Sequence, residues 1–466
     1  MKKEHISIRA VILWLVIWEI GALLLNKEVF LVSPVRTVMR LGQLAVTAGF
    51  WFPVVGSLMR IVSGYILALA AALVLSRIAF IRPGVRSLLA PLIAAIKAVP
   101  VASFVILALI CFSSKYLAVF LAFLIVTPLV YANALAGYDS QSIELAEMAD
   151  VFRINKWRKF RYIEIPQIQS HVMSAAKTGI GMAWKAGIAA EVIGTPDASI
   201  GQKLYQAKVY LETPDLLAWT AVVIILSVAT EGLFIFMLGK LFKGLKSVPS
   251  NRGVTKRHVQ VTDRQSVVDR QQSIADRQSA AGSGDITFDR VTKSFGDTRV
   301  LKKYSRTFSA GKTSVIMAPS GSGKTTILRM IAGLEKPDSG SVGASDRVAM
   351  VFQEDRLLDY LTAYGNIKVA VPNASADDIR NHLTEMGIPE EELDKPVGCW
   401  SGGMKRRAAL LRALTADGVL LLDEPFKGLD QEAKDMTIRV TGDMANKRTL
   451  RSEEHTSELQ SRSAIS

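Results

Sequence analysis

The first half of the chain contains six apolar stretches, each about as long as a lipid bilayer is thick. They cover residues 8–26, 57–79, 87–111, 117–136, 174–194 and 217–239. A helix of roughly 20 apolar residues is needed to cross the hydrocarbon core. Because that core offers no water to backbone groups, each stretch must be helical. We therefore expect residues 1–249 to form an α-helical membrane domain with about six spans.

The distribution of charge separates a membrane protein from a nucleic-acid-binding protein. The net charge is +14 and the mean hydropathy is +0.27. The basic residues lie between apolar stretches and do not form a face interleaved with aromatic residues, which excludes a nucleic-acid partner. They cluster before the first stretch and after the second, fourth and sixth. Such clusters mark cytoplasmic loops, so we expect a multi-pass protein with both termini in the cytoplasm.

The fifth apolar stretch is the least regular of the six. Lys177, Lys185 and Glu191 interrupt it. Charged residues inside a span usually face the interior of the bundle or a transport pathway. The alternative is that they mark an error in the limits of the stretch.

The second half of the chain changes character twice. Residues 250–284 are polar and repeat Asp-Arg-Gln-Ser at 263–266 and 276–279. Such a segment cannot bury a core, so we expect a flexible linker. From residue 285 short β-branched runs alternate with helical stretches. This pattern predicts an α/β domain with a parallel sheet over residues 285–450.

A glycine-rich loop follows the strand predicted at Thr313–Met317 and precedes a helix. This is the context of a P-loop, whose backbone N–H groups surround phosphate oxygens. Lys324 would reach the β- and γ-phosphates of ATP, and Thr325 would bind Mg²⁺. Ala318 stands where the strict pattern has Gly. The predicted phosphate-binding residues are Ser320, Gly321, Ser322, Gly323, Lys324, Thr325 and Thr326.

Two carboxylates end a second buried strand at Val419–Leu422. Asp423 suits a water-mediated contact with Mg²⁺, and Glu424 suits a general base that polarises the attacking water. The alternative is an ordinary strand ending in solvated acids. The P-loop upstream favours the functional interpretation.

Trp400-Ser401-Gly402-Gly403-Met404 opens a basic helix just before that strand. It resembles the signature motif of ATP-binding cassette (ABC) ATPases, with Trp400 and Met404 departing from the usual Leu and Gln. The resemblance implies an ABC-type P-loop ATPase in which Ser401, Gly402 and Gly403 close over ATP held by a second ATPase. It also implies that Gln353 is the Q-loop residue, acting in catalysis and on Mg²⁺. Asp430 would be the D-loop acid, and Phe295 the aromatic residue stacked on adenine.

A second resemblance lies in the membrane half. Glu147, Ala149, Ile163 and Pro166 resemble the cytoplasmic coupling loop of importer permeases, although Arg153 replaces its Gly and Ile165 its Leu. The alternative is a basic loop that binds lipid headgroups. Together with Lys97–Pro100, this loop is similar to permeases of the nitrate, sulfonate, taurine and bicarbonate importer group.

These resemblances imply ATP-driven import of a small solute across a bacterial cytoplasmic membrane, with nitrate, sulfonates and taurine as candidates. The expected ligands are ATP and Mg²⁺. The expected partners are membrane lipid, an extracytoplasmic solute-binding protein, and either a second copy of the chain or a homologous chain. Two alternatives are an exporter half-transporter and a non-transporting ATPase that acts on membrane or partner proteins.

The end of the sequence does not fit the domain that precedes it. Residues 451–466 are strongly polar, unlike a buried central strand. Residues 451–461 also match the translation of a common sequencing adapter. We therefore expect an assembly artefact and an ATPase domain truncated at 450. His455 would not be the family's switch histidine, and hydrolysis by this chain would be weak or absent. The alternative is a genuine polar tail.

Overall fold

The computed structural model describes residues 8–25, 30–246, 285–310, 312–316, 322–344, 347–445 and 450–452. The chain divides into two units. One comprises Met1–Gln141 and Ile165–Gly244, and the other comprises Ser142–Glu164 and Leu245–Ser466. The predicted linker, residues 250–284, lies outside the described residues.

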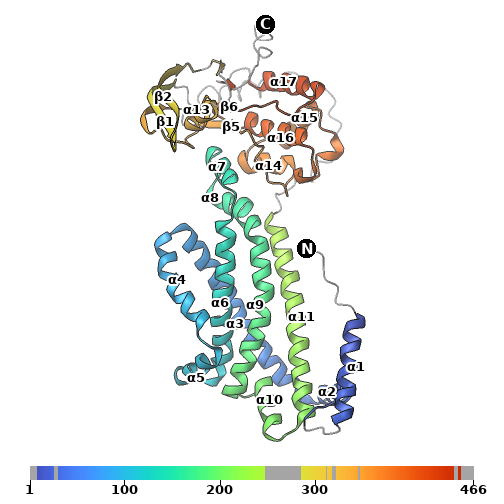
Figure 1. The fold of residues 1–466 in the computed structure, drawn as a ribbon. Coiled ribbons are helices and arrows are strands. Elements are labelled where there is room, and N and C mark those ends of the chain that lie inside the picture. The colour runs from blue at the N-terminus through green and yellow to red at the C-terminus, as the bar shows by residue number, and fades with distance from the viewer. Residues whose placement is uncertain are drawn as a thin grey trace. The chain divides into compact units, whose positions relative to one another are not determined.

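The first unit is helical (Figure 1). Its helices are α1 (Ile8–Leu25), α2 (Pro34–Ala45), α3 (Ala48–Ile81), α4 (Pro83–Ala98), α5 (Val101–Cys111), α6 (Ser114–Asp139), α9 (Ile165–Gly194), α10 (Ile200–Val209) and α11 (Thr213–Lys246). Helices α3, α6 and α9 pack around a core that includes Tyr65, Val126 and Trp184. Small residues bring α3 close to α6, since a Cβ on Gly64 would lie 2.5 Å from the Val119 carbonyl oxygen.

Five of the six predicted stretches fall on one helix each and the third falls on two, but fewer than six helices meet the criteria for a span. Within the described part of the chain, three are long and apolar enough: Ala48–Ile81, Ser114–Asp139 and Thr213–Leu245. A bent pair of helices, Pro83–Ala98 with Ser103–Cys111, raises the number to four if it forms one span. The prediction of about six spans is therefore not confirmed. Helix α9, which carries the charges noted in the fifth stretch, is not among these helices.

The third predicted span, residues 87–111, is wrong as a continuous helix. The structure has α4 and α5, with a bend of 110° between Pro83–Ala98 and Ser103–Cys111. Pro100 is the cause, because proline has no N–H to donate and disfavours helical backbone in the residue before it. Val99 accordingly has extended backbone, with φ −78° and ψ 130°.

Glu191 lies in the last turn of α9 and is fully buried. Ser57 Oγ donates a hydrogen bond to Glu191 Oε2 over 2.5 Å, and Arg60 Nε donates to Oε1 over 2.9 Å. The backbone N–H of Gly201 also donates to Oε2, over 3.2 Å. This carboxylate therefore joins α9 to α3 and to the start of α10. Its burial agrees with a charge that faces the interior of the bundle.

The second unit contains two sheets. Strands β1 (Ile286–Phe295), β2 (Thr298–Phe308) and β4 (Ser339–Gly343) form an antiparallel sheet in the order β2-β1-β4. Strands β3 (Ser314–Val315), β5 (Val348–Val351), β6 (Val419–Leu422) and β7 (Leu450–Ser452) form a parallel sheet in the order β3-β7-β6-β5. Its helices include α13 (Lys324–Ile331), α14 (Ala363–Ala370), α15 (Ala376–Glu385), α16 (Gly402–Thr415) and α17 (Gln431–Ala445). The predicted α/β class is confirmed.

Strand β7 corrects one expectation about the end of the sequence. Leu450 pairs with Leu420 of β6, and Arg451 pairs with Ser314 of β3. The prediction that residues from 451 onward stay out of the central sheet is thus wrong for Arg451 and Ser452. The backbone groups of neighbouring strands require partners, and polar residues can supply them as well as apolar ones. Residues 453–466, including His455, lie outside the described residues.

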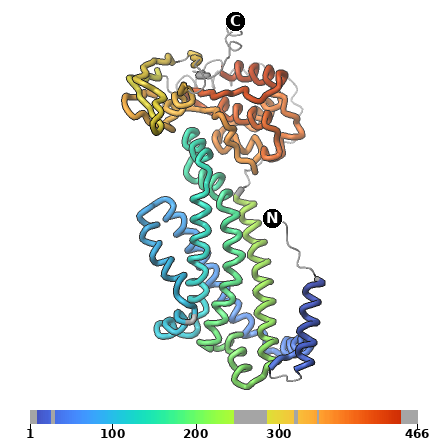
Figure 2. Tube along the Cα trace, viewed as in Figure 1, coloured from blue at the N-terminus to red at the C-terminus, as the bar shows by residue number. Residues whose placement is uncertain are grey.

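The second unit also contains a segment that interrupts the predicted permease, which we call the coupling segment (residues 142–164). It consists of α7 (Ile143–Val151), α8 (Lys156–Arg158) and a π-helix (Lys159–Glu164). Figure 2 shows this segment beside the α/β domain, whose residues lie more than a hundred positions further along the chain. Its buried residues join the core of the α/β domain; they are Met148, Ala149, Val151, Phe152, Ile154, Tyr162 and Ile163. The predicted domain limits of 1–249 and 285–450 therefore assign the coupling segment to the membrane domain, whereas it packs with the α/β domain.

Candidate functional site

The predicted phosphate loop leads directly into α13, which begins at Lys324. Gly323 has φ +90°, and a Cβ there would lie 2.6 Å from Val300 Cγ1. Only glycine fits such a position. Thr325 and Thr326 occupy the first turn of α13, where free N–H groups favour anions. Ser320 and Gly321 lie outside the described residues.

The predicted carboxylates stand at the end of β6. Asp423 is 2% exposed, and its N–H donates to the Val351 carbonyl oxygen over 3.1 Å. Glu424 has φ +47°, a strained value for a residue with a side chain. Its Oε2 accepts a hydrogen bond from Lys427 Nζ over 2.5 Å. Strain of this kind is common where a side chain must be aimed at a reacting group.

Two buried oxygen atoms at this end of the sheet have no hydrogen-bond partner among the described residues. They are Ser322 Oγ, beside the start of α13, and Asp423 Oδ2. Buried polar atoms without a partner are uncommon in folded proteins. A hydroxyl and a carboxylate so placed fit a magnesium-bound phosphate group, since carboxylate and hydroxyl oxygens suit Mg²⁺. The residues present therefore fit the predicted ATP and Mg²⁺.

The signature-like motif caps helix α16. Ser401 Oγ accepts a hydrogen bond from the N–H of Met404 over 3.3 Å, and Ser401 and Gly402 are exposed. Trp400 is buried, and its indole N–H donates to the Glu392 carbonyl oxygen over 3.2 Å. Its departure from Leu is therefore accommodated in the core. The exposed loop beside it leaves backbone N–H groups accessible to an anion.

The three remaining nucleotide residues lie in different elements. Gln353 is exposed and follows β5. Asp430 caps α17, because its Oδ1 accepts a hydrogen bond from the N–H of Ala433 over 2.8 Å. Phe295 ends β1 and is 48% exposed, with Lys293 Nζ 5.1 Å from its ring centre. An exposed ring is available for stacking, although the capping contact gives Asp430 a structural role as well.

Sequence reasoning missed Arg406, a buried arginine on α16. Its Nη1 donates to the Phe352 carbonyl oxygen over 2.6 Å. Its Nη2 donates to the carbonyl oxygens of Asp423 and Glu424 over 2.6 and 2.5 Å. Arg406 thereby holds together the carboxyl ends of β5 and β6. It lies between Lys405 and Arg407 in a basic run, so no signal in the sequence set it apart.

Glu147 of the coupling segment contacts two arginines of the α/β domain. Its carboxylate accepts two hydrogen bonds from Arg329, over 2.6 and 3.0 Å, and one from Arg356 over 2.7 Å. Arg329 belongs to α13, the helix that begins at Lys324, and Arg356 follows Gln353. The hydrogen bond from Arg329 is the main cause of a lowered pKa at Glu147, with Arg356 adding to it. The carboxylate is therefore charged at neutral pH.

The other predicted coupling residues divide between the two units. Ala149 and Ile163 are buried in the second unit, 1% and 2% exposed. Pro166 is the second residue of α9, in the first unit. Arg153, at the position of the family's Gly, has φ +48°, the left-handed backbone that glycine adopts most easily. The structure therefore explains why that position favours glycine.

The alternative of a loop devoted to lipid headgroups receives little support. Arg158 Nη1 donates to the Lys368 carbonyl oxygen over 3.3 Å, and Lys159 Nζ lies 2.7 Å from Asp150 Oδ1. Both basic residues therefore have protein partners in the second unit.

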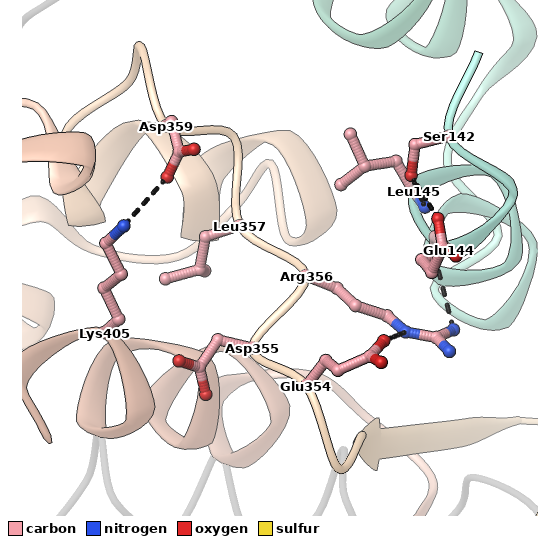
Figure 3. A pocket seen from close by; sticks show the side chains of 9 residues that line it. All are labelled: Ser142, Glu144, Leu145, Glu354, Asp355, Arg356, Leu357, Asp359 and Lys405. Carbon is pink, nitrogen blue, oxygen red and sulfur yellow. Dashed lines mark hydrogen bonds and ion pairs between the residues drawn. The ribbon is translucent and has the colours of Figure 1, made fainter. Parts of the chain in front are cut away.

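A cleft of about 340 Å³ lies beside these contacts (Figure 3). It is lined by Ser142, Glu144, Leu145, Glu354, Asp355, Arg356, Leu357, Asp359 and Lys405. Lys405 Nζ lies 3.2 Å from Asp359 Oδ1 across it. The lining thus comes from the coupling segment, from the loop after Gln353 and from α16.

Two family matches cover the two parts of the chain. Residues 61–243 match the family described as the binding-protein-dependent transport system inner membrane component. Residues 301–427 match the family described as ABC transporter. The chain therefore joins a binding-protein-dependent permease domain to an ABC transporter ATPase domain.

Several curated proteins resemble the ATPase part. An aliphatic sulfonates import ATP-binding protein of Rhodococcus jostii (strain RHA1) is 37% identical over 162 residues, which are 34% of this chain and 60% of that protein. One from Granulibacter bethesdensis is 38% identical, over 31% of this chain and 61% of that protein. The chain thus spans about three fifths of the length of these relatives.

Two further comparisons also concern the ATPase part. A Nod factor export ATP-binding protein of Burkholderia lata is 38% identical over 32% of this chain and 55% of that protein. Among solved structures, the ATP-binding cassette MJ0796 bound to ADP and phosphate is 25% identical, with a TM-score of 0.34, over 37% of this chain and 89% of that chain. Because relatives of the ATPase part include an export protein, this part alone does not define the direction of transport.

Proposed function

We propose that the chain imports a small solute across a bacterial cytoplasmic membrane at the expense of ATP. The observation that carries this proposal is the coupling segment. It is continuous with permease helices α6 and α9, yet its apolar residues belong to the core of the ATPase domain. The permease family is described by its dependence on a binding protein, which favours import over the exporter alternative.

The nucleotide would be held by the residues at the carboxyl end of the parallel sheet. Lys324 and Thr326 would bind phosphate oxygens. Thr325, Asp423 and Gln353 would hold Mg²⁺, which neutralises phosphate charge. Glu424 would accept the proton of the attacking water. Because Lys427 donates a hydrogen bond to the Glu424 carboxylate in this structure, that hydrogen bond must break before Glu424 can act as a base.

The motif at Ser401–Gly403 begins with two exposed residues and is separate from Lys324 in sequence. We propose that it closes over ATP bound to a second ATPase domain, in a homodimer or in a pair with a homologous chain. Closure would pull on the coupling segments, and hydrolysis would reset the transporter. Nitrate, sulfonates or taurine are the proposed solutes, and a separate extracytoplasmic protein would deliver them.

The test is solute uptake into proteoliposomes that contain the full chain. ATP and Mg²⁺ are enclosed in the lumen, and radiolabelled taurine is added outside with the binding protein encoded beside the gene. Uptake that requires both lumenal ATP and the external binding protein supports the proposal, and competition by nitrate or alkyl sulfonates defines the substrate. Transport that proceeds without the binding protein would favour the exporter alternative. Nucleotide turnover insensitive to every solute would favour a non-transporting ATPase.

A further inference from the structure

Arg412 is a second buried arginine on helix α16, and the nucleotide site does not account for it. Its side chain is among the largest that are fully buried, with 1% exposed. Its Nη1 donates to the carbonyl oxygen of Arg356 over 2.7 Å, and its Nη2 donates to that of Asp355 over 3.1 Å. The guanidinium also lies over the ring of Phe152, 5.1 Å from its centre. Arg412 thus touches both the loop after Gln353 and the coupling segment.

Stability alone accounts poorly for a charge at this place. Among the described residues, Arg412 makes no ion pair with a carboxylate, and its Nε has no hydrogen-bond partner. Burial lowers the pKa of Arg412 to about 10, so the side chain remains charged at neutral pH. A buried charge compensated only by carbonyl groups and a ring is costly, and an apolar side chain of similar size often serves a core better. Its contacts therefore suggest a role in holding a particular arrangement.

Arg406 and Arg412 together form a continuous series of contacts from the end of β6 to the coupling segment. Arg406 binds the carbonyl oxygens of Asp423 and Glu424, and its Nη1 lies 3.2 Å from Asp355 Oδ1. Arg412 binds the next part of the same loop and the ring of Phe152. Both arginines belong to α16, the helix that Ser401 caps. A displacement of α16 must therefore move the end of β6, the loop at 352–356 and the coupling segment together.

Resting on the function proposed above, we propose that Arg412 is the positioning residue through which α16 moves the coupling segment when nucleotide binds. Arg406 transmits the position of the main chain at Asp423 and Glu424 to the loop at 352–356, and Arg412 transmits it onward to Phe152. The role is distinct from that of Glu147. Glu147 contacts a side chain of α13 and the side chain of Arg356. Arg412 instead belongs to α16 and contacts the backbone of the loop at 352–356.

The test is amide hydrogen exchange in residues 142–164 of the full chain, with and without MgATP, alongside MgATP affinity. In the unsubstituted chain we expect MgATP to change the exchange rate of these amides on the order of tenfold. In Arg412→Met we expect MgATP affinity to stay within about twofold of the unsubstituted chain, while the exchange response falls below about twofold. Arg412→Lys, which keeps the charge, should restore part of the response.

Two further variants keep the test decisive. Phe152→Leu removes the ring but remains apolar, so it should lose the response even if Arg412→Met does not fold. Arg407→Met removes a buried arginine of the same helix that donates instead to the Met386 carbonyl oxygen, over 2.6 Å, and it should keep the response. A full response in folded Arg412→Met or in Phe152→Leu would overturn the proposal, as would an equal loss in Arg407→Met. If the unsubstituted chain fails to bind MgATP, the proposed function fails and this role fails with it.

Discussion

Replacing Glu147 with Gln should loosen the coupling segment by an amount that the structure allows us to estimate. The substitution removes the charge that Arg329 and Arg356 share, while the size of the side chain is kept. Hydrogen bonds to charged groups contribute about 1.5–3 kcal/mol each. The side chains of Glu147, Arg329 and Arg356 are 19%, 26% and 9% exposed, so the lower value applies to each arginine. The expected loss is about 3 kcal/mol for the two contacts.

Hydrogen exchange in α7 measures this loss directly. This helix has nine residues, too few to be stable alone in water. Its amides therefore exchange when the coupling segment leaves the α/β domain, and their exchange rate reports the free energy of that opening. Since about 1.4 kcal/mol corresponds to a factor of ten, Glu147→Gln should accelerate exchange in α7 by about a hundredfold.

Glu144→Gln is the matched control. Glu144 lies one turn earlier on α7, is exposed, and accepts a hydrogen bond from Ser142 Oγ over 2.7 Å. Its neutralisation should change the exchange rate by less than about fivefold, the size of a helix-end charge effect. Equal exchange rates in Glu147→Gln and Glu144→Gln would refute the idea that the two arginines hold the segment through Glu147.

Further predictions concern pH, backbone strain, nucleotide binding and the gene. The folded-state pKa of Glu147 is lowered, so its contribution to docking is complete above its unfolded pKa of about 4.3 and is lost as pH falls through the folded value. Protection of α7 should therefore be constant from neutral pH down to about 5 and weaken below about 4. Arg153→Gly should raise the free energy of opening of the coupling segment by up to about 1 kcal/mol, because it relieves the left-handed backbone; slower exchange would show this. Lys324→Met should weaken MgATP binding at least about tenfold in a fluorescence titration, and unchanged affinity would argue against the phosphate site. Resequencing across the codon for Leu450 should reveal an apolar strand leading to a histidine, and the 466-residue chain should hydrolyse ATP weakly or not at all; a frame that truly ends at Ser466, or strong turnover, would contradict the adapter interpretation.

Local patterns predicted much of the second half of the chain. A buried strand, a glycine-rich loop and a helix are contiguous, so the sequence alone located Gly323, Lys324 and the two carboxylates at 423 and 424. Strand β6 was predicted with the limits that the structure has. These features depend on neighbours within a few residues, where propensity and periodicity carry information.

What the sequence could not reveal depends on contacts between distant segments. The buried arginines of α16 have partners more than fifty residues away in the loop after β5. The sequence of a basic helix does not indicate which residues its side chains will contact. The coupling segment was predicted from its motif, but its membership in the ATPase core follows from packing with residues far along the chain. The bend at Pro100 was, in contrast, readable: the proline was visible within an apolar stretch, and hydropathy outweighed it in the prediction.

The order of strands in the parallel sheet has a consequence for synthesis on the ribosome. Strand β3 precedes the phosphate loop, and the strand that the structure places beside it is β7, which follows it by more than a hundred residues. A nascent chain therefore makes the loop long before it makes the strand that anchors it. The nucleotide pocket should therefore mature only after the strand that lies between β3 and β6 has been made. ATP would then bind after this part of the parallel sheet has assembled and could not serve as an early template for its folding.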